Sequence, residues 1–116
     1  MTYNKDYYDD EEIISLKSYI EKIKKEIIER QDIVKKSKEE LDDLYDSMQS
    51  LGSVFKRAEE AVNYSLRIQE KNVLKKQIDI KRKNITEQEK DLQKAKELLS
   101  ITQKELEELI KERMIQ

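Results

Sequence analysis

The sequence has 116 residues, of which 43% are charged and 36% hydrophobic, and its formal net charge is -2. With one Phe and no Trp, it has too few large apolar side chains for a globular core of several layers, but enough to line a coiled coil or a small bundle. The absence of Cys and His excludes disulfides and thiol nucleophiles, and it removes the commonest general base and metal ligand. We therefore expect an all-α protein that is not an enzyme and binds no cofactor or metal.

The N-terminal half of the sequence predicts a flexible tail followed by one long helix. Residues 1–9 contain three Tyr among polar residues and have no helical period, so we expect a flexible tail there. Asp9 or Asp10 suits the N-cap of a helix, with acidic residues in its first turn, where the helix dipole favours them. Apolar residues then recur at heptad spacing, and we predict a helix over about residues 10–51. The a positions are 13, 20, 27, 34, 41 and 48, and the d positions are 16, 23, 30, 37, 44 and 51.

Gly52 is the only Gly in the chain, and Pro is absent. Because Gly tolerates the left-handed conformation that ends many helices, and Ser53 is a good N-cap, we predict a turn at Gly52. A second helix is expected over about residues 53–115. It carries an apolar row at Ile78, Ile85, Leu92, Leu99 and Leu106. The two helices would form an antiparallel helical hairpin or coiled coil, as a single domain over residues 10–116.

The expected hairpin has more apolar surface than it can cover by folding on itself. Apolar doublets such as Ile27/Ile28 and Leu109/Ile110 recur on both helices and widen the stripe beyond what a two-helix contact needs. With a turn at Gly52, residues 96–116 would also overhang the first helix by roughly 30 Å. We therefore expect a partner protein or a second copy to complete a bundle. The candidate partner-binding residues are Leu51, Phe55, Leu99, Leu106, Leu109 and Ile110.

Basic residues outnumber acidic ones in two segments, 22–38 and 67–83. With a turn at Gly52 these segments would lie side by side and form a basic waist. A solvated surface of alternating charge and docking against an acidic partner both stay open as explanations. Nucleic-acid binding is disfavoured, because the chain is acidic overall and the segments lack interleaved aromatic residues.

Arg30 and Ser37 interrupt the apolar d row of the first helix. One interpretation is a polar layer that fixes the register and the partner, as polar core residues do in coiled coils. The other is that Arg30 extends to solvent and Ser37 lies at a loosely packed position. Both interpretations stay open at this point.

The turn region carries a resemblance to a known family. The stretch from Leu51 to Ala61, continued by Leu66 and Arg67 and a second helix rich in Lys, Glu and Gln, resembles small helical accessory proteins encoded beside LXG toxins of type VII secretion. The hairpin is also similar to the WXG or ESX proteins, although the Trp of their Trp-x-Gly turn is missing here. The resemblance implies a protein that binds the helical N-terminal LXG domain of a toxin and helps to target it for export. A second small helical accessory protein is a further candidate partner.

The export signal of such systems is an aromatic residue followed four residues later by Asp or Glu. This spacing places both side chains on one face of a helix. The sequence offers Tyr7/Glu11, Tyr8/Glu12 and Phe55/Glu59. With 26 acidic residues in the chain, such pairs also arise by chance, and Phe55 with Glu59 is retained only as a candidate targeting motif.

The sequence thus predicts a non-catalytic partner that packs on the helical N-terminal domain of a type VII-secreted LXG toxin and assists its targeting. The alternative is a self-assembling structural coiled coil, a homodimeric four-helix bundle. No apolar stretch approaches the roughly 20 residues that span a bilayer, so we expect no membrane insertion. The first residues do not resemble a signal peptide, and we expect a cytoplasmic protein, with co-export without a cleaved signal left open.

Overall fold

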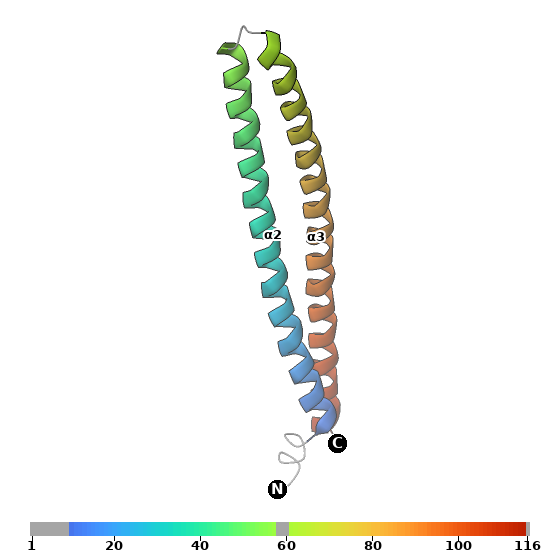
Figure 1. Cartoon of the computed structure of the whole chain (residues 1–116). Coiled ribbons are helices and arrows are strands. Elements are labelled where there is room, and N and C mark those ends of the chain that lie inside the picture. Colours follow the sequence, from blue (N-terminus) through green and yellow to red (C-terminus); the bar gives the residue numbers. More distant parts are fainter. Residues whose placement is uncertain (1–9, 58–60, 116) are drawn as a thin grey trace. The chain divides into compact units, whose positions relative to one another are not determined.

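The computed structural model describes residues 10–57 and 61–115, and in these ranges the chain is all-α. Helix α2 spans Glu11–Arg57, with 47 residues, and helix α3 spans Ala61–Ile115, with 55 residues. The two helices run antiparallel and pack against each other (Figure 1). The predicted helical hairpin is therefore confirmed.

The start of α2 is fixed by its N-cap, as the sequence predicted. The Oδ1 atom of Asp10 accepts hydrogen bonds from the backbone N–H groups of Glu12 at 2.9 Å and Ile13 at 3.4 Å. Glu11 and Glu12 lie in the first turn, where the positive end of the helix dipole stabilises negative charge. The expected flexible tail and Asp9, within residues 1–9, lie outside the described residues.

The predicted turn at Gly52 is wrong. Helix α2 continues through Gly52 to Arg57, and α3 begins at Ala61 instead of Ser53. No described residue has a positive φ, so no left-handed position ends α2 at Gly52. The physical reason is that Gly inside a helix costs only about 1 kcal/mol relative to Ala, and no Pro follows to force an end.

The helices pack in two compact units, and each unit contains part of both helices. Unit 1 consists of the described residues up to Gln31 together with those from Lys90 onward. Unit 2 consists of Asp32–Glu89. The single domain expected over residues 10–116 stays a prediction.

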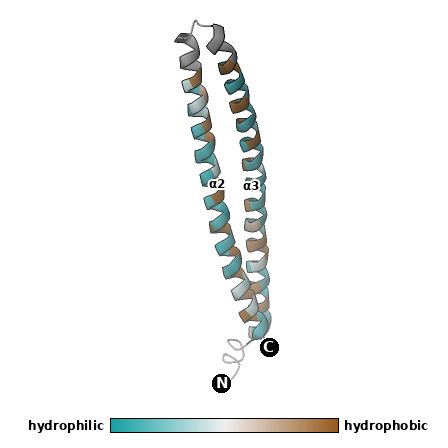
Figure 2. Ribbon diagram, in the orientation of Figure 1, coloured by the Kyte–Doolittle hydropathy of each residue, from teal (hydrophilic) through white to brown (hydrophobic). Residues whose placement is uncertain are grey.

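Helix α2 faces α3 through the heptad positions that the sequence predicted. Between residues 11 and 51, every a and d position is buried or half-buried, and every other position is exposed. We call this set of inward positions, with its counterpart on α3, the seam. Figure 2 shows how apolar residues recur along both helices between polar ones. The regular pattern explains why α2 forms one uninterrupted amphipathic helix.

The apolar row predicted for the second helix also lies in the seam. Ile78 and Ile85 are buried, whereas Leu92, Leu99 and Leu106 are half-buried. In unit 1, a core cluster forms where α2 meets α3. It consists of Ile23, Ile27 and Ala95, with Leu92 and Leu99 packed against it.

Ion pairs between the helices show the register of unit 1. The Arg113 guanidinium lies 2.6 Å from an Asp10 oxygen and 3.1 Å from a Glu12 oxygen. Arg30 lies 3.8 Å from Asp91. Since the last turn of α3 reaches the first turn of α2, the predicted overhang of residues 96–116 is wrong. The overhang followed from the turn at Gly52, and it disappears when α2 extends to Arg57.

The predicted basic waist is also wrong. Arg30 of segment 22–38 contacts Asp91, and Lys38 of the same segment contacts Glu89 at 3.5 Å. In unit 2, Lys81 of segment 67–83 contacts Glu40. Each of these basic side chains therefore contacts an acidic residue of the other helix. The reason is that, in the observed register, segments 22–38 and 67–83 are not side by side.

Candidate partner-binding site

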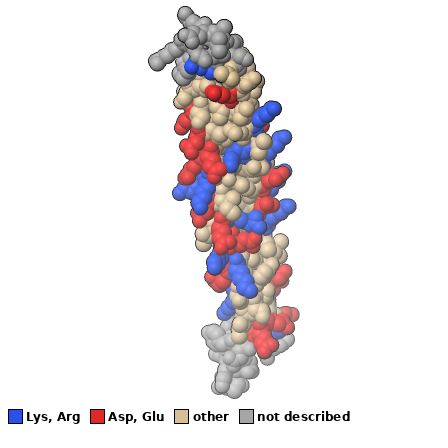
Figure 3. Space-filling view, viewed as in Figure 1, with Lys and Arg blue, Asp and Glu red and all other residues tan. Residues whose placement is uncertain are grey.

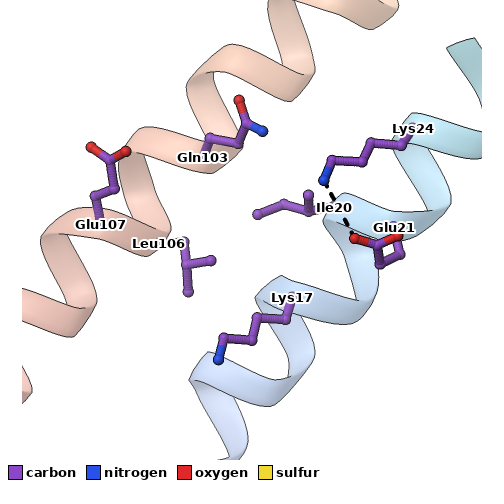
Figure 4. Close-up of a pocket in the computed structure, with 7 residues that line it drawn as sticks. All are labelled: Lys17, Ile20, Glu21, Lys24, Gln103, Leu106 and Glu107. Carbon is purple, nitrogen blue, oxygen red and sulfur yellow. Dashed lines mark hydrogen bonds and ion pairs between the residues drawn. The ribbon is translucent and has the colours of Figure 1, made fainter.

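Unit 1 contains an open groove between α2 and α3, with a volume of about 610 Å³. Ile20 and Leu106 point into the groove from the two helices (Figure 4). Long polar side chains surround this apolar floor. The lining residues are Lys17, Ile20, Glu21 and Lys24 of α2 and Gln103, Leu106 and Glu107 of α3.

Ile20 is buried in the seam, only 6% exposed, and Leu106 is half-buried, so the groove opens mainly between the long polar side chains beside them. Lys24 and Gln103 extend from the two helices toward each other beside Ile20 (Figure 4). The Lys24 ammonium lies 3.4 Å from a Glu21 carboxylate on the same helix. An exposed pair of this kind contributes about 0–1 kcal/mol, so a ligand can displace it at little cost.

Exposed apolar side chains lie beyond the groove, on the same helix faces as two of its lining residues. Ile14 and Ile28 lie one heptad on either side of Glu21, and their exposed fractions are 51% and 60%. Met114 lies one heptad beyond Glu107 and is 68% exposed. Isolated exposed hydrophobic residues are common on protein surfaces, so these three residues are of interest only because they continue the helix faces that line the groove.

Three of the sequence-predicted partner-binding residues lie near this groove. Leu106 lines it, and Leu109 and Ile110 are half-buried in the same part of α3. Leu99 instead packs on the core cluster of unit 1. The prediction that these residues bind a partner stays a prediction.

The other predicted site residues are in the second half of α2 and beyond it. Leu51 is half-buried in the seam. Phe55 belongs to α2, but its side chain is outside the described residues, and so is Glu59. The candidate targeting motif formed by these two residues stays a prediction.

Arg30 is half-buried at its seam position and binds acidic residues on both helices. Its guanidinium donates hydrogen bonds to Glu26 at 3.1 and 2.7 Å and lies 3.8 Å from Asp91. The hydrogen bonds to Glu26 and the two negative charges raise the pKa of Arg30, which therefore stays charged. Ser37 is buried in the seam of unit 2, only 7% exposed. A role for either residue in setting the register stays a prediction.

The sequence reasoning missed further polar residues in the seam of α3. Thr102 is 3% exposed, and its hydroxyl donates to the Leu98 carbonyl at 2.8 Å. The Gln88 Oε1 atom is buried without a hydrogen-bond partner among the described residues. Both residues lie three positions after the predicted apolar row, at Leu99 and Ile85. Extending that row with the three-residue heptad step would have found them.

Unit 2 has a second exposed apolar surface on α3. Leu66, Val73 and Ile80, here called the outer row, are 57%, 53% and 59% exposed and follow each other at heptad spacing. A shallow groove of about 500 Å³ lies along part of this row, lined by Leu66, Gln69, Glu70, Val73 and Leu74. The outer row lies apart from the seam, which on α3 contains Ile78 and Ile85. Helix α3 therefore has apolar residues on two faces in unit 2, as a helix in a larger bundle does.

Neither a metal centre nor a membrane span is found in the part of the chain that the structure describes. Within residues 10–57 and 61–115, no group of three or more acidic side chains is arranged to hold a metal ion. In the same ranges, neither helix is long and apolar enough to cross a bilayer. Comparison of the chain with protein-family models, curated proteins and solved structures finds no match.

Proposed function

We propose that this chain is a non-catalytic binding partner of a longer helical protein, and that it receives a helix of that partner in the groove of unit 1. In its specific form, the proposal names the helical N-terminal domain of a type VII-secreted LXG toxin as the partner. Binding would cover apolar surface of the toxin in the cytoplasm and assist its targeting for export. The specific form rests on the resemblance of the stretch from Leu51 to Ala61 to LXG accessory proteins.

The observation that carries the proposal is the groove over Ile20 and Leu106 with its apolar extensions. A two-helix seam needs a narrow stripe, whereas Ile14, Ile28 and Met114 place further apolar surface beside it. An amphipathic helix recognises such a surface by inserting side chains at positions i, i+3, i+4 and i+7. Burial of apolar area at about 25 cal/mol per Å² favours this association, after the cost of ordering the partner is subtracted.

A tagged full-length chain, recovered from the source organism with its bound proteins, tests the proposal. Mass spectrometry should identify one large protein with a helical N-terminal LXG domain. The Ile14→Glu/Ile28→Glu variant should lose this protein, because charge introduced on the apolar surface beside the groove cannot be buried under a partner helix without a counter-ion. Both positions are largely exposed, so the variant should keep its helix content and its melting temperature.

The matched control is Ile101→Glu. Ile101 is 56% exposed in unit 1, but it lies two residues before the groove residue Gln103, on the far side of α3. This control should retain the partner. Recovery of the chain alone would contradict the proposed function and favour the self-assembling coiled coil. Retention of the partner by Ile14→Glu/Ile28→Glu would show that the groove is not the binding surface.

A further inference from the structure

Unit 2 carries opposite charges along its two edges, outside the seam. Lys76 and Lys83 flank the outer row of α3 and are exposed; they are called here the basic strip. Glu39, Asp43 and Asp46 are exposed on α2 and are called the acidic strip. Glu39 and Asp46 each follow a seam residue by two positions, and Lys83 follows the seam residue Lys81 in the same way. These side chains therefore point away from the seam on both helices.

The two strips lie at the same level along unit 2. The Lys81–Glu40 ion pair fixes which parts of α2 and α3 are side by side. Counting along the antiparallel helices from this pair, Lys83 is level with residue 38, next to Glu39, and Lys76 is level with residue 45, next to Asp46. Figure 3 shows the result in its upper part, with acidic side chains on the α2 side and basic side chains on the α3 side.

This arrangement is complementary to itself in one orientation. When a second copy is stacked with its α2 on α3 of the first, its acidic strip meets the basic strip of the first copy. Two-fold symmetry then places the same contact between α2 of the first copy and α3 of the second. If α3 were stacked on α3 of the second copy, like charges would meet wherever the charged segments overlap. Like charges brought together at an interface are costly, so the charge pattern selects the first orientation.

The apolar surface of unit 2 fits the same orientation. Val73 lies in the middle of the outer row and lines the shallow groove. On α2, Val73 is level with residue 48, and Ser47 and Ser50, on either side of that residue, are both exposed and small. Small side chains allow a second helix to approach closely, so Val73 of one copy fits between these serines of the other. Stacking would thereby remove Val73 from water.

We infer that the chain forms a symmetric dimer through unit 2, with α3 of each copy packed on α2 of the other. The outer row forms the apolar part of the contact, and the basic strip pairs with the acidic strip along its edge. This inference concerns a different surface from the groove in unit 1. It does not depend on the proposed function.

Sedimentation velocity of the purified full-length chain, without any partner, tests the dimer. The wild-type chain should sediment as a dimer, and Lys76→Glu/Lys83→Glu should raise the dissociation constant at least about tenfold. Adding Glu39→Lys and Asp46→Lys to that variant should restore the dimer, because the charges of both strips are then reversed.

The matched control is Lys75→Glu/Arg82→Glu, which makes the same charge change on another face of α3 and should remain dimeric. A wild-type chain that is monomeric up to roughly 100 μM would overturn the inference.

Cysteine cross-linking tests the orientation, since the chain has no cysteine of its own. One chain carries Lys76→Cys, and a second chain carries Asp46→Cys. An oxidised mixture should give a cross-link between the two chains, because these positions meet across the proposed contact. Efficient cross-linking of Lys76→Cys to itself would show α3 packed on α3 and would overturn the proposed orientation. A variant that loses the dimer, such as Lys76→Glu/Lys83→Glu, should still capture the toxin partner. Failure of the dimer proposal can therefore be distinguished from failure of the proposed function.

Discussion

Asp10 joins the two ends of the hairpin in unit 1 through its two carboxylate oxygens. Oδ1 caps the N-terminus of α2, and Oδ2 accepts a hydrogen bond from Arg113 in the last turn of α3. The Arg113 hydrogen bond, followed by the bonds from the Glu12 and Ile13 amides, lowers the pKa of Asp10. A lowered carboxylate pKa stabilises the fold above the unfolded value of about 3.9, and this contribution is lost as the pH falls through the folded pKa.

We therefore predict that Asp10→Asn lowers the melting temperature at pH 7. Below about pH 4, the melting temperature of this variant should fall less with decreasing pH than that of the wild-type chain. Asn retains N-cap ability but loses the charge that pairs with Arg113, so Asp10→Ala should destabilise the chain further. Melting curves from pH 2 to pH 7, recorded by circular dichroism, give the comparison. Parallel pH profiles for the wild-type chain and Asp10→Asn would contradict the assigned role of the ion pair.

Two neighbouring isoleucines should respond differently to truncation. Ile27 is 9% exposed and belongs to the core cluster, whereas Ile28 is 60% exposed. Ile27→Ala should lower the free energy of unfolding by about 2–4 kcal/mol, because it removes buried apolar contacts and leaves a cavity. Ile28→Ala should change it by less than about 0.5 kcal/mol. Urea titrations measure both values, and equal effects would contradict the assigned seam.

At the level of the helical element, Gly52 gives a test of where α2 ends. Because Gly52 lies inside α2, Gly52→Ala should raise the free energy of unfolding by about 1 kcal/mol and the melting temperature by a few degrees. If Gly52 instead ended the helix in a left-handed conformation, the Cβ atom of Ala would lower the stability. Ser18→Ala, at an exposed position of α2 outside the proposed dimer contact, is the control for a general gain in helix propensity. A destabilised Gly52→Ala variant would favour the turn that the sequence predicted.

The heptad pattern and the N-cap were predictable because they depend on residues close together in the sequence. Seam residues such as Ile13 and Leu51 follow from a spacing of three and four, and Asp10 needs only the first turn. The end of α2 was not predictable in the same way. A Gly in a helix costs about 1 kcal/mol, which a long seam and ion pairs such as Lys81–Glu40 easily outweigh.

The misplaced turn at Gly52 also produced the two other wrong predictions, the overhang of residues 96–116 and the basic waist. The reason is that the register of a hairpin depends on the position of its turn. Each residue by which the turn moves shifts the facing residue by two. With the turn at Gly52, Arg30 would face about residue 74, but it contacts Asp91. The groove was missed for the same reason: it forms only where the true register places Ile20 beside Leu106. Leu106 itself was predictable as an apolar residue of the second helix, but the residue facing it was not.

At the scale of the whole molecule, the two proposed surfaces should be separable by mutation. Ile14 and Ile28, one heptad on either side of the groove residue Glu21, belong to unit 1, whereas the basic strip, Lys76 and Lys83, belongs to unit 2. No residue is shared between them, and effects of mutations at independent sites add. At a concentration between the two dissociation constants, Lys76→Glu/Lys83→Glu should therefore be mainly monomeric and still capture the helical partner. Ile14→Glu/Ile28→Glu should remain a dimer that captures none.

Light scattering coupled to size-exclusion chromatography measures both properties on the same samples. The wild-type complex should contain two copies of the chain and two of the partner, and the Lys76→Glu/Lys83→Glu complex one of each. Loss of partner capture in the monomeric variant would show that the two surfaces are energetically coupled. In that case dimerisation would be part of the partner-binding step, because a ligand that binds only the dimer must also stabilise it.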